Sequence, residues 1–319
     1  MTKRISHRPR LGVSACLMGQ PVRFDGGHKN NRFISTSLID HMDFESVCPE
    51  IESGMTVPRP TIQLRRKNED IRLVMSKQPD RDLTEQMNTY AMSKLDSLAD
   101  LDGYIFKKDS PSCGVFGVPV VINQQGYKAR EGTGVFAKAF MERYPLIPVE
   151  EEGRLNDTAL RENFIERVYA YCRWKSIPDP QHNVQGFIEF HTRHKLMLMA
   201  RGSHYYQELG RIVAGVRAAD LSQRRETYIG KFMEVLQQTV PRGRQVNVLQ
   251  HILGYLKNAL SPDDKQELLA SFEAYRDCQI PLITPITLLR HYLRVHPQPY
   301  INQQYYLKPC PETLALRSS

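Results

Sequence analysis

At 319 residues the chain is long enough for two domains, and a hydrophobic content of 41% with a mean hydropathy of -0.46 is that of an ordinary soluble protein. This composition excludes a wholly disordered chain, and the sequence contains no run of about eighteen apolar residues for a membrane span. The net charge of +8 allows an anionic partner, yet 43 Lys and Arg against 35 Asp and Glu do not make a polycation.

The chain begins with a basic stretch, Met1 to Arg8, that leads into no signal-peptide core. We therefore expect a cytoplasmic protein.

Short apolar segments separated by turns dominate the first 150 residues. Strands are predicted over 11–15, 44–47, 103–106 and 118–122, and helices over 32–41, 82–98 and from 136 to 141. The segment 53–81, which contains Pro58 and Pro60, is interpreted as a long excursion. Because strands alternate with helices, we predict an α/β domain with a mainly parallel, Rossmann-like sheet, whose strand order stays open.

The second half has a different, helical character. The seam is expected at 148–153, followed by a helix over 155–174. Further helices are predicted over 184–200, 204–219, 223–239, 246–260, 262–278 and 285–295, and an extended tail from 297. Ser261 before Pro262 is a typical helix start. We therefore predict an α/β domain over 1–155, a connecting helix and linker over 156–179, and an all-α domain over 180–319.

The six cysteines are irregularly spaced, which favours free thiols or metal ligands over a disulfide scaffold. Cys16, Cys48 and Cys113 each follow a predicted strand and enter a turn. Because an α/β sheet gathers its sites at the carboxyl ends of its strands, we expect these three to converge. The other three, in helical or terminal contexts, are interpreted as incidental thiols: Cys172, Cys278 and Cys310.

Three converging thiolates leave several chemistries open. They could hold three irons of a [4Fe-4S] cluster with the fourth iron free, or a zinc ion with a further ligand, or they could be unrelated buried thiols. No fourth cysteine stands in an equivalent turn, and no CxxC pair is present. An open coordination position would indicate a catalytic rather than a structural site.

Several motifs resemble those of a known family. The N-terminal half contains, in the family's order, motifs that resemble those of the thiouracil desulfidase (TudS) family: Ser14-Ala15-Cys16-Leu17-Met18-Gly19, Arg23-Phe24-Asp25-Gly26, Cys48-Pro49-Glu50 and Ser110-Pro111-Ser112-Cys113-Gly114. The segments 190–199 and 206–210 resemble the YbgA-type domain of unknown function. The combination resembles the RudS-type desulfidases, which remove sulfur from 4-thiouridine in tRNA.

The resemblance implies that Cys16, Cys48 and Cys113 hold a [4Fe-4S] cluster whose open iron binds the thiocarbonyl sulfur. It implies a non-redox, iron-sulfur-dependent desulfidase that converts 4-thiouridine in tRNA to uridine and sulfide. One alternative substrate is free 2-thiouracil or a thiouridine nucleotide. A second alternative is a non-enzymatic, cluster-bearing RNA-binding or regulatory protein. No membrane partner is expected, and the oligomeric state stays open.

Five further residues of these motifs are candidates for the reaction. Glu50 is a candidate base or proton shuttle, unless backbone amides satisfy its carboxylate. Ser110 and Ser112 are catalytic candidates, because the resemblance places a catalytic serine in their turn, although such hydroxyls also bond their own backbone. Arg23 and Asp25 either bind substrate or fix their loop.

The helical half and one glycine pair offer weaker candidates. His191, His194 and His204 have metal-site spacing, but neighbouring cations would repel a metal. A basic face for phosphates is the stronger hypothesis: Arg193, Lys195, Arg201, Arg211 and Arg217. Four tyrosines could stack on bases or belong to the core: Tyr205, Tyr206, Tyr228 and Tyr255. Gly132-Thr133-Gly134 either receives a phosphate at a helix start or forms a turn.

Overall fold

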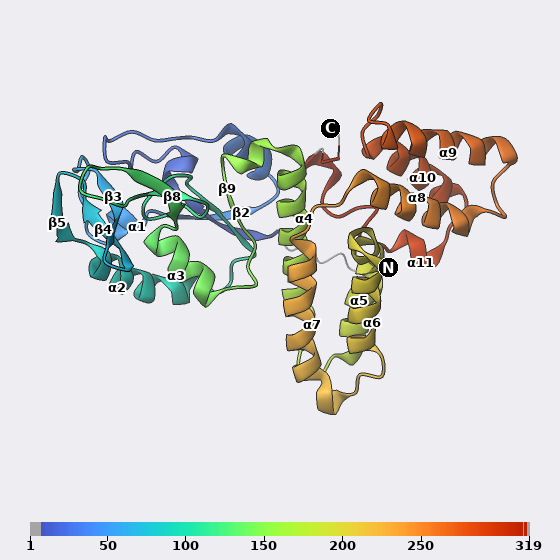
Figure 1. Cartoon of the computed structure of the whole chain (residues 1–319). Helices are drawn as coiled ribbons and strands as arrows, with labels where there is room; N and C mark the ends of the chain where they lie inside the picture. The colour runs from blue at the N-terminus through green and yellow to red at the C-terminus, as the bar shows by residue number, and fades with distance from the viewer. Residues whose placement is uncertain (1–7, 315, 318–319) are drawn as a thin grey trace. The chain divides into compact units, whose positions relative to one another are not determined.

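A computed structural model describes residues 8–314, 316 and 317, and it divides the chain into two compact units, Met1–Asp157 and Thr158–Ser319 (Figure 1). Residues 1–7 of the basic start lie outside the described residues. None of the described helices combines the length and apolar character that a membrane crossing needs.

The first unit contains a fully parallel sheet in the order β2-β1-β6-β9. Its strands are β1 (Arg10–Ser14), β2 (Asp43–Val47), β6 (Gly103–Phe106) and β9 (Val149–Glu151). The central strands β1 and β6 are almost completely buried, as their continuous apolar runs predicted. This sheet confirms the predicted α/β domain. β9 occupies the segment where we expected the seam, and the chain divides after Asp157.

A second, mixed sheet has the order β5-β4-β3-β7-β8 and is antiparallel except for the β3–β7 pair. Its strands are β3 (Ile62–Lys67), β4 (Asp70–Met75), β5 (Gln78–Asp82), β7 (Val118–Val121) and β8 (Lys128–Gly132). The interpretation of 53–81 as an excursion is therefore wrong, since β3, β4 and most of β5 lie within it. β5 and β8 are polar and mostly exposed edge strands, so they lack the apolar alternation that identifies a strand.

Short helices complete the first unit: α1 (Pro49–Glu52), α2 (Thr84–Leu95) and α3 (Val135–Arg143). α2 and α3 lie side by side (Figure 1). The helix predicted over 32–41 is a π-helix at Phe33–Leu38. Tyr104 of β6 stacks on Phe106 with ring centroids 3.9 Å apart, and its ring lies so close to Gly12 that a Cβ there would be 2.2 Å from it. Gly12 thus gives β1 and β6 room to carry an aromatic core against α3.

The second unit is helical, and no residue that the structure describes in it forms a strand, which confirms the all-α prediction. Its helices are α4 (Thr158–Lys175), α5 (Val184–Arg201), α6 (Ser203–Val213), α7 (Leu221–Leu236), α8 (Arg242–Leu256), α9 (Pro262–Arg276), α10 (Ile283–Val295) and α11 (Pro299–Asn302). Ser261 caps α9 by accepting from Asp264 N–H, as its sequence predicted. The tail expected to be extended instead contains α11 and a 3₁₀ turn at Glu312–Leu314.

Candidate functional site

The three strand-end cysteines line one cavity of about 410 Å³ in the first unit. Cys16 lies in the 3₁₀-helix Ala15–Met18 directly after β1, Cys48 is the N-cap of α1 after β2, and Cys113 lies in the turn that follows β6. These strands are parallel neighbours in the sheet, so their carboxyl ends open on the same edge. All six cysteines of the chain are free thiols. The structure thus brings the three thiols together where their strand-end positions predicted.

The environment of each thiol opposes the loss of its proton. Burial raises the pKa of Cys16 to about 11, although Lys107 and Arg23 act to lower it. Burial also raises the pKa of Cys48, although backbone N–H groups at the start of α1 act to lower it. It raises the pKa of Cys113 well above the usual range, although a hydrogen bond from Ser14 acts to lower it. A cationic centre that binds these thiols would therefore have to displace protons from them.

The turn that carries Cys113 is ordered by its own serine. Ser110 Oγ accepts hydrogen bonds from the backbone N–H groups of Ser112, at 3.2 Å, and Cys113, at 3.1 Å. Gly114 N–H donates to the Ser110 carbonyl at 2.8 Å. The Ser110 side chain lines the cavity, so with its acceptor capacity in use its O–H remains a donor toward that space.

The amino terminus of α3 holds the same turn from outside. Phe136 N–H donates to the Ser112 carbonyl at 3.0 Å, Val135 N–H to Pro111 at 3.1 Å, and Gly134 N–H to Gly114 at 2.7 Å. The N–H groups that a phosphate would use are therefore occupied by the turn. This excludes the phosphate interpretation of Gly132-Thr133-Gly134 and supports the turn interpretation.

Gly134→Ala is expected to disturb the Cys113 turn. An added Cβ would lie 2.5 Å from the Ser112 carbonyl carbon and 2.7 Å from Cys113 N, both backbone atoms that cannot rotate away. We expect unfolding free energy to fall by about 1–3 kcal/mol, together with reduced iron uptake on reconstitution. Thermal unfolding and iron analysis measure both. Gly254→Ala in α8, where nothing lies within 4 Å of an added Cβ, is the control; equal iron content in the two variants would contradict the prediction.

Glu50 is held at the cavity by two side chains. Arg59 donates from Nε to Glu50 Oε2 at 3.1 Å and from Nη2 to the same oxygen. Ser112 Oγ donates to Glu50 Oε1 at 3.1 Å. The backbone-amide interpretation of this carboxylate is therefore wrong, since it is the neighbouring carboxylate of Glu52 that accepts from the Cys48 backbone N–H. Ser112 is fully buried and acts on Glu50 rather than on the cavity space.

Sequence reasoning missed Arg59. Its side chain is 6% exposed, and besides Glu50 it donates from Nη2 to the Val22 carbonyl at 3.1 Å. Its own N–H donates to the Phe24 carbonyl at 2.9 Å. Arg59 therefore joins the Glu50 carboxylate to the loop that follows Cys16. Only its position between Pro58 and Pro60, close after Glu50, set it apart in the sequence.

Arg23 Nε lies 3.7 Å from Asp25 Oδ1, but the other contacts of these two residues differ. Arg23 lines the cavity, and its Nε is buried without a hydrogen-bond partner among the described residues. Asp25 lies outside the lining and accepts from Gly27 N–H at 3.0 Å, a bond that lowers the pKa of its carboxyl. Asp25 thus fixes the loop, whereas Arg23 faces the cavity.

Cations outnumber carboxylates around the cavity. The cationic lining residues are Arg23, Lys29, Arg59, Lys107 and Lys108, and the acidic ones are Glu50 and Asp109. The three lysines were missed in the sequence, because lone lysines in turns carry no pattern. Their charge suits thiolates and an anionic ligand.

Of the three histidines with metal-site spacing, His191 and His194 belong to the core of the second unit, whereas His204 is exposed. His191 Nδ1 lies 3.0 Å from the Tyr228 hydroxyl, and His194 Nδ1 lies 2.7 Å from the Phe190 carbonyl. Burial lowers the pKa of His191 to about 4 and holds the pKa of His194 well below its usual value. His204 packs on Tyr205 with centroids 3.8 Å apart. Within the described residues, no group of three or more His, Cys, Asp or Glu side chains is arranged to hold a metal ion. The metal interpretation of these histidines thus gains no support.

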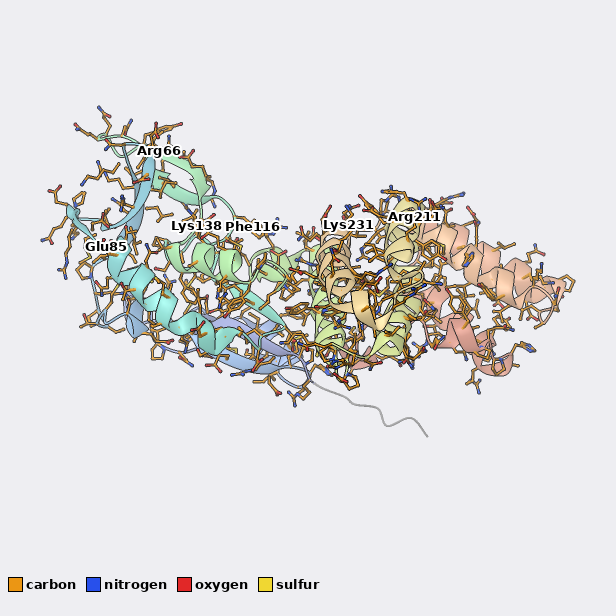
Figure 2. All side chains as sticks on the ribbon, turned by 90° about the horizontal axis from the view of Figure 1, so that it is seen from below. Arg66, Glu85, Phe116, Lys138, Arg211 and Lys231 are labelled. Atoms are coloured by element: carbon orange, nitrogen blue, oxygen red, sulfur yellow. The ribbon has the colours of Figure 1, made fainter. Side chains whose placement is uncertain are left out.

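Part of the expected basic face is also buried. Arg201 is 2% exposed and pairs with Glu166, and Tyr228 is fully buried, so neither can meet a nucleic acid. Arg193 is paired with Glu189. Arg211 of α6 still belongs to the expected basic face (Figure 2). Lys195 Nζ lies 5.8 Å from the centre of the Tyr206 ring. Tyr255 is 40% exposed.

Three thiols, a carboxylate held by Arg59 and Ser112, and the Ser110 hydroxyl therefore lie at the edge of the parallel sheet. Residues 11–152 match the family model described as 2-thiouracil desulfurase, and residues 195–311 match the one described as Protein of unknown function (DUF1722). The two matches lie in the halves of the chain that resemble the desulfidase and YbgA-type families, and they confirm that resemblance.

Two individual proteins are similar to parts of the chain. The uncharacterized protein YbgA of Escherichia coli (strain K12) is 27% identical over 133 residues, which are 41% of this chain and 79% of YbgA. A solved structure of a [4Fe-4S]-dependent thiouracil desulfidase, TudS, shares 28% sequence identity and covers 48% of this chain and 97% of its own, with a TM-score of 0.38.

Proposed function

We propose that the first unit holds a [4Fe-4S] cluster on Cys16, Cys48 and Cys113 and removes sulfur from a thiolated uracil base. The observation that carries the proposal is the meeting of three free strand-end thiols in one cavity of a 2-thiouracil desulfurase domain.

The residues of the cavity suit such a cluster. The surplus of lining cations offsets the charge of three thiolates, and Ser14 hydrogen-bonds to Cys113. We favour the cluster over the zinc alternative because a soft thiocarbonyl sulfur suits iron in a sulfide cluster.

When bound, such a cluster supplies an iron with an open position, a soft Lewis acid suited to a thiocarbonyl sulfur. Glu50 is positioned by Arg59 and Ser112 to accept a proton from a water molecule that attacks the thiocarbonyl carbon. Ser110 donates its O–H to the base or the departing sulfur. The carbon gains the water oxygen and the sulfur leaves as hydrogen sulfide, so the reaction is a hydrolysis without electron transfer.

The roles of the two serines differ in this scheme. Ser110 lines the cavity and contacts the substrate. Ser112 is buried outside the cavity lining and positions Glu50 through its hydrogen bond to Oε1. Arg23 binds substrate, and Asp25 supports the loop that presents it.

For the substrate we favour 4-thiouridine in tRNA, with the DUF1722 domain as the RNA-binding part. The support is the set of cationic and aromatic side chains outside its core, which include Lys195, Tyr206 and Arg211. A base brought out of its stack to reach the cavity would cost on the order of a few kcal/mol. Action on tRNA and the six free thiols both suit the cytoplasm.

The test uses the full-length protein, reconstituted anaerobically and incubated with tRNA that contains 4-thiouridine. We expect loss of 4-thiouridine in nucleoside analysis and release of an equal amount of sulfide. Parallel reactions with free 2-thiouracil and 4-thiouridine 5′-monophosphate separate the substrates. Persistence of 4-thiouridine in tRNA alongside turnover of a small substrate would overturn the tRNA proposal, and no sulfide from any of them would favour a non-enzymatic regulator.

A further inference from the structure

Ser14 does not play the local role that its position in the chain suggests. It is the last residue of β1 and stands directly before the 3₁₀-helix Ala15–Met18, where a serine hydroxyl commonly caps the helix. Here the Ser14 side chain makes no capping hydrogen bond. Ser14 is 3% exposed and lies at the wall of the cysteine cavity. A buried hydroxyl that leaves its own helix uncapped is expected to have its partners elsewhere.

Both partners of the Ser14 hydroxyl come from the chain that follows β6. Ser14 Oγ accepts a hydrogen bond from Lys107 N–H at 2.9 Å, although the two residues are 93 positions apart. Because β1 and β6 are parallel neighbours, this bond joins the ends of the two strands. The second partner is the side chain of Cys113, with which the Ser14 side chain is hydrogen-bonded. A thiolate can only accept, so Ser14 O–H is the donor when Cys113 is charged.

The three thiols of the cavity differ in what would face their negative charge. Cys48 has backbone N–H groups at the start of α1 as hydrogen-bond donors, and Cys16 has two cationic side chains near it. Cys113 is 5% exposed, and what faces its sulfur is the Ser14 hydroxyl, while a carboxylate and the other two thiols oppose its charge. Cys113 therefore depends on a side-chain hydroxyl where the other two have backbone groups or full charges.

We propose that Ser14 is a positioning residue of the metal centre, which donates a hydrogen bond to the Cys113 thiolate and so holds this ligand in its charged form. This inference rests on the proposed cluster and adds a residue that supports it. Groups that hydrogen-bond to a metal ligand orient the ligand and tune the metal. In iron-sulfur centres, hydrogen bonds to the sulfurs also set the reduction potential. Ser14 acts through Cys113 rather than on the substrate.

Ser14→Ala removes the hydroxyl and is expected to weaken the hold on iron. The full-length protein is reconstituted anaerobically and titrated with EDTA, and visible absorbance follows the loss of the cluster. We expect Ser14→Ala to lose its cluster at an EDTA concentration about 10–100-fold lower than the unmodified protein, the usual effect of removing a group that supports a metal ligand. Its reduction potential, measured by spectroelectrochemistry, should become more negative, because the hydroxyl no longer withdraws charge from the thiolate. Ser14→Thr keeps the hydroxyl and should restore both values.

Thr84→Ala is a closely matched control. The Thr84 hydroxyl also accepts from a backbone N–H, that of Leu73, at 2.9 Å. It also hydrogen-bonds to an anionic side chain, that of Asp82, but it lies outside the cavity lining. Each alanine variant loses one hydroxyl and leaves one backbone N–H without its partner, so the unfolding temperatures of the iron-free proteins should fall by similar amounts. Only Ser14→Ala should change the EDTA concentration and the potential.

The outcomes separate this inference from the function on which it rests. A Ser14→Ala protein with the cluster retention and the potential of the unmodified protein would overturn the inference alone. So would equal losses of cluster in Ser14→Ala and Thr84→Ala, which would assign the effect to general destabilisation. An unmodified protein that takes up no iron would overturn the proposed cluster and the role of Ser14 together. A cluster that responds to Ser14→Ala in a protein that releases no sulfide would count against the desulfidase function only.

Discussion

Cys113→Ala is expected to abolish cluster binding and desulfidase activity while the fold is retained. Cys113 is 5% exposed and lies in a turn held by Ser110 and by α3, so the backbone keeps its place when the sulfur is removed. The lost packing should cost about 1 kcal/mol. With two thiols left, an assembled [4Fe-4S] cluster would lack a ligand to a second iron. Iron and sulfide analysis, visible absorbance and sulfide release measure the outcome.

Cys172→Ala is the matched control for that experiment. Cys172 is 6% exposed, in α4 of the other unit, and does not line the cavity. It should reconstitute with the iron content of the unmodified protein. A Cys113→Ala protein that kept a full cluster would remove Cys113 from the ligand set and with it the proposed site.

The fold could be predicted where burial leaves a pattern in the sequence. β1 and β6 are covered on both faces, so their residues form continuous apolar runs that identify them. β5, with the sequence Gln-Pro-Asp-Arg-Asp, is exposed along its whole length and is defined only by its pairing with β4. Such a strand depends on a neighbour that the local sequence does not specify.

The residues of the site also differ in whether the sequence could predict them. The convergence of Cys16, Cys48 and Cys113 follows from three strand ends and one parallel sheet. Arg59 and Lys107 reach the cavity only through tertiary structure, so no local spacing indicates them. In the helical unit, Arg201 was predicted to be a surface cation but is buried. Its partner Glu166 lies 35 positions away in the sequence and compensates its charge.

Because Glu50 is ion-paired with Arg59, Glu50 has to be tested both in a single variant and in a double variant with Arg59. Glu50→Gln keeps the shape of the side chain but removes its charge, which leaves the 6% exposed guanidinium of Arg59 without a counter-ion. Removing one partner of a buried ion pair costs about 3–5 kcal/mol. The single variant should therefore be less stable, and any loss of activity in it has two explanations. Adding Arg59→Gln removes the uncompensated charge and separates them.

We expect both Glu50→Gln and Glu50→Gln/Arg59→Gln to retain the cluster and to lose turnover by about 10²–10⁴-fold, the usual contribution of a positioned acid-base group. Only the double variant should recover thermal stability. Iron content, unfolding temperature and initial rates of sulfide release are measured on the same preparations, with Arg72→Gln, an exposed arginine of β4, as the control for loss of a guanidinium. Recovery of turnover together with stability in the double variant would show that Glu50 serves only to neutralise Arg59. A stable, cluster-loaded and inactive double variant would leave the Glu50 carboxylate as the group that handles the proton of the attacking water.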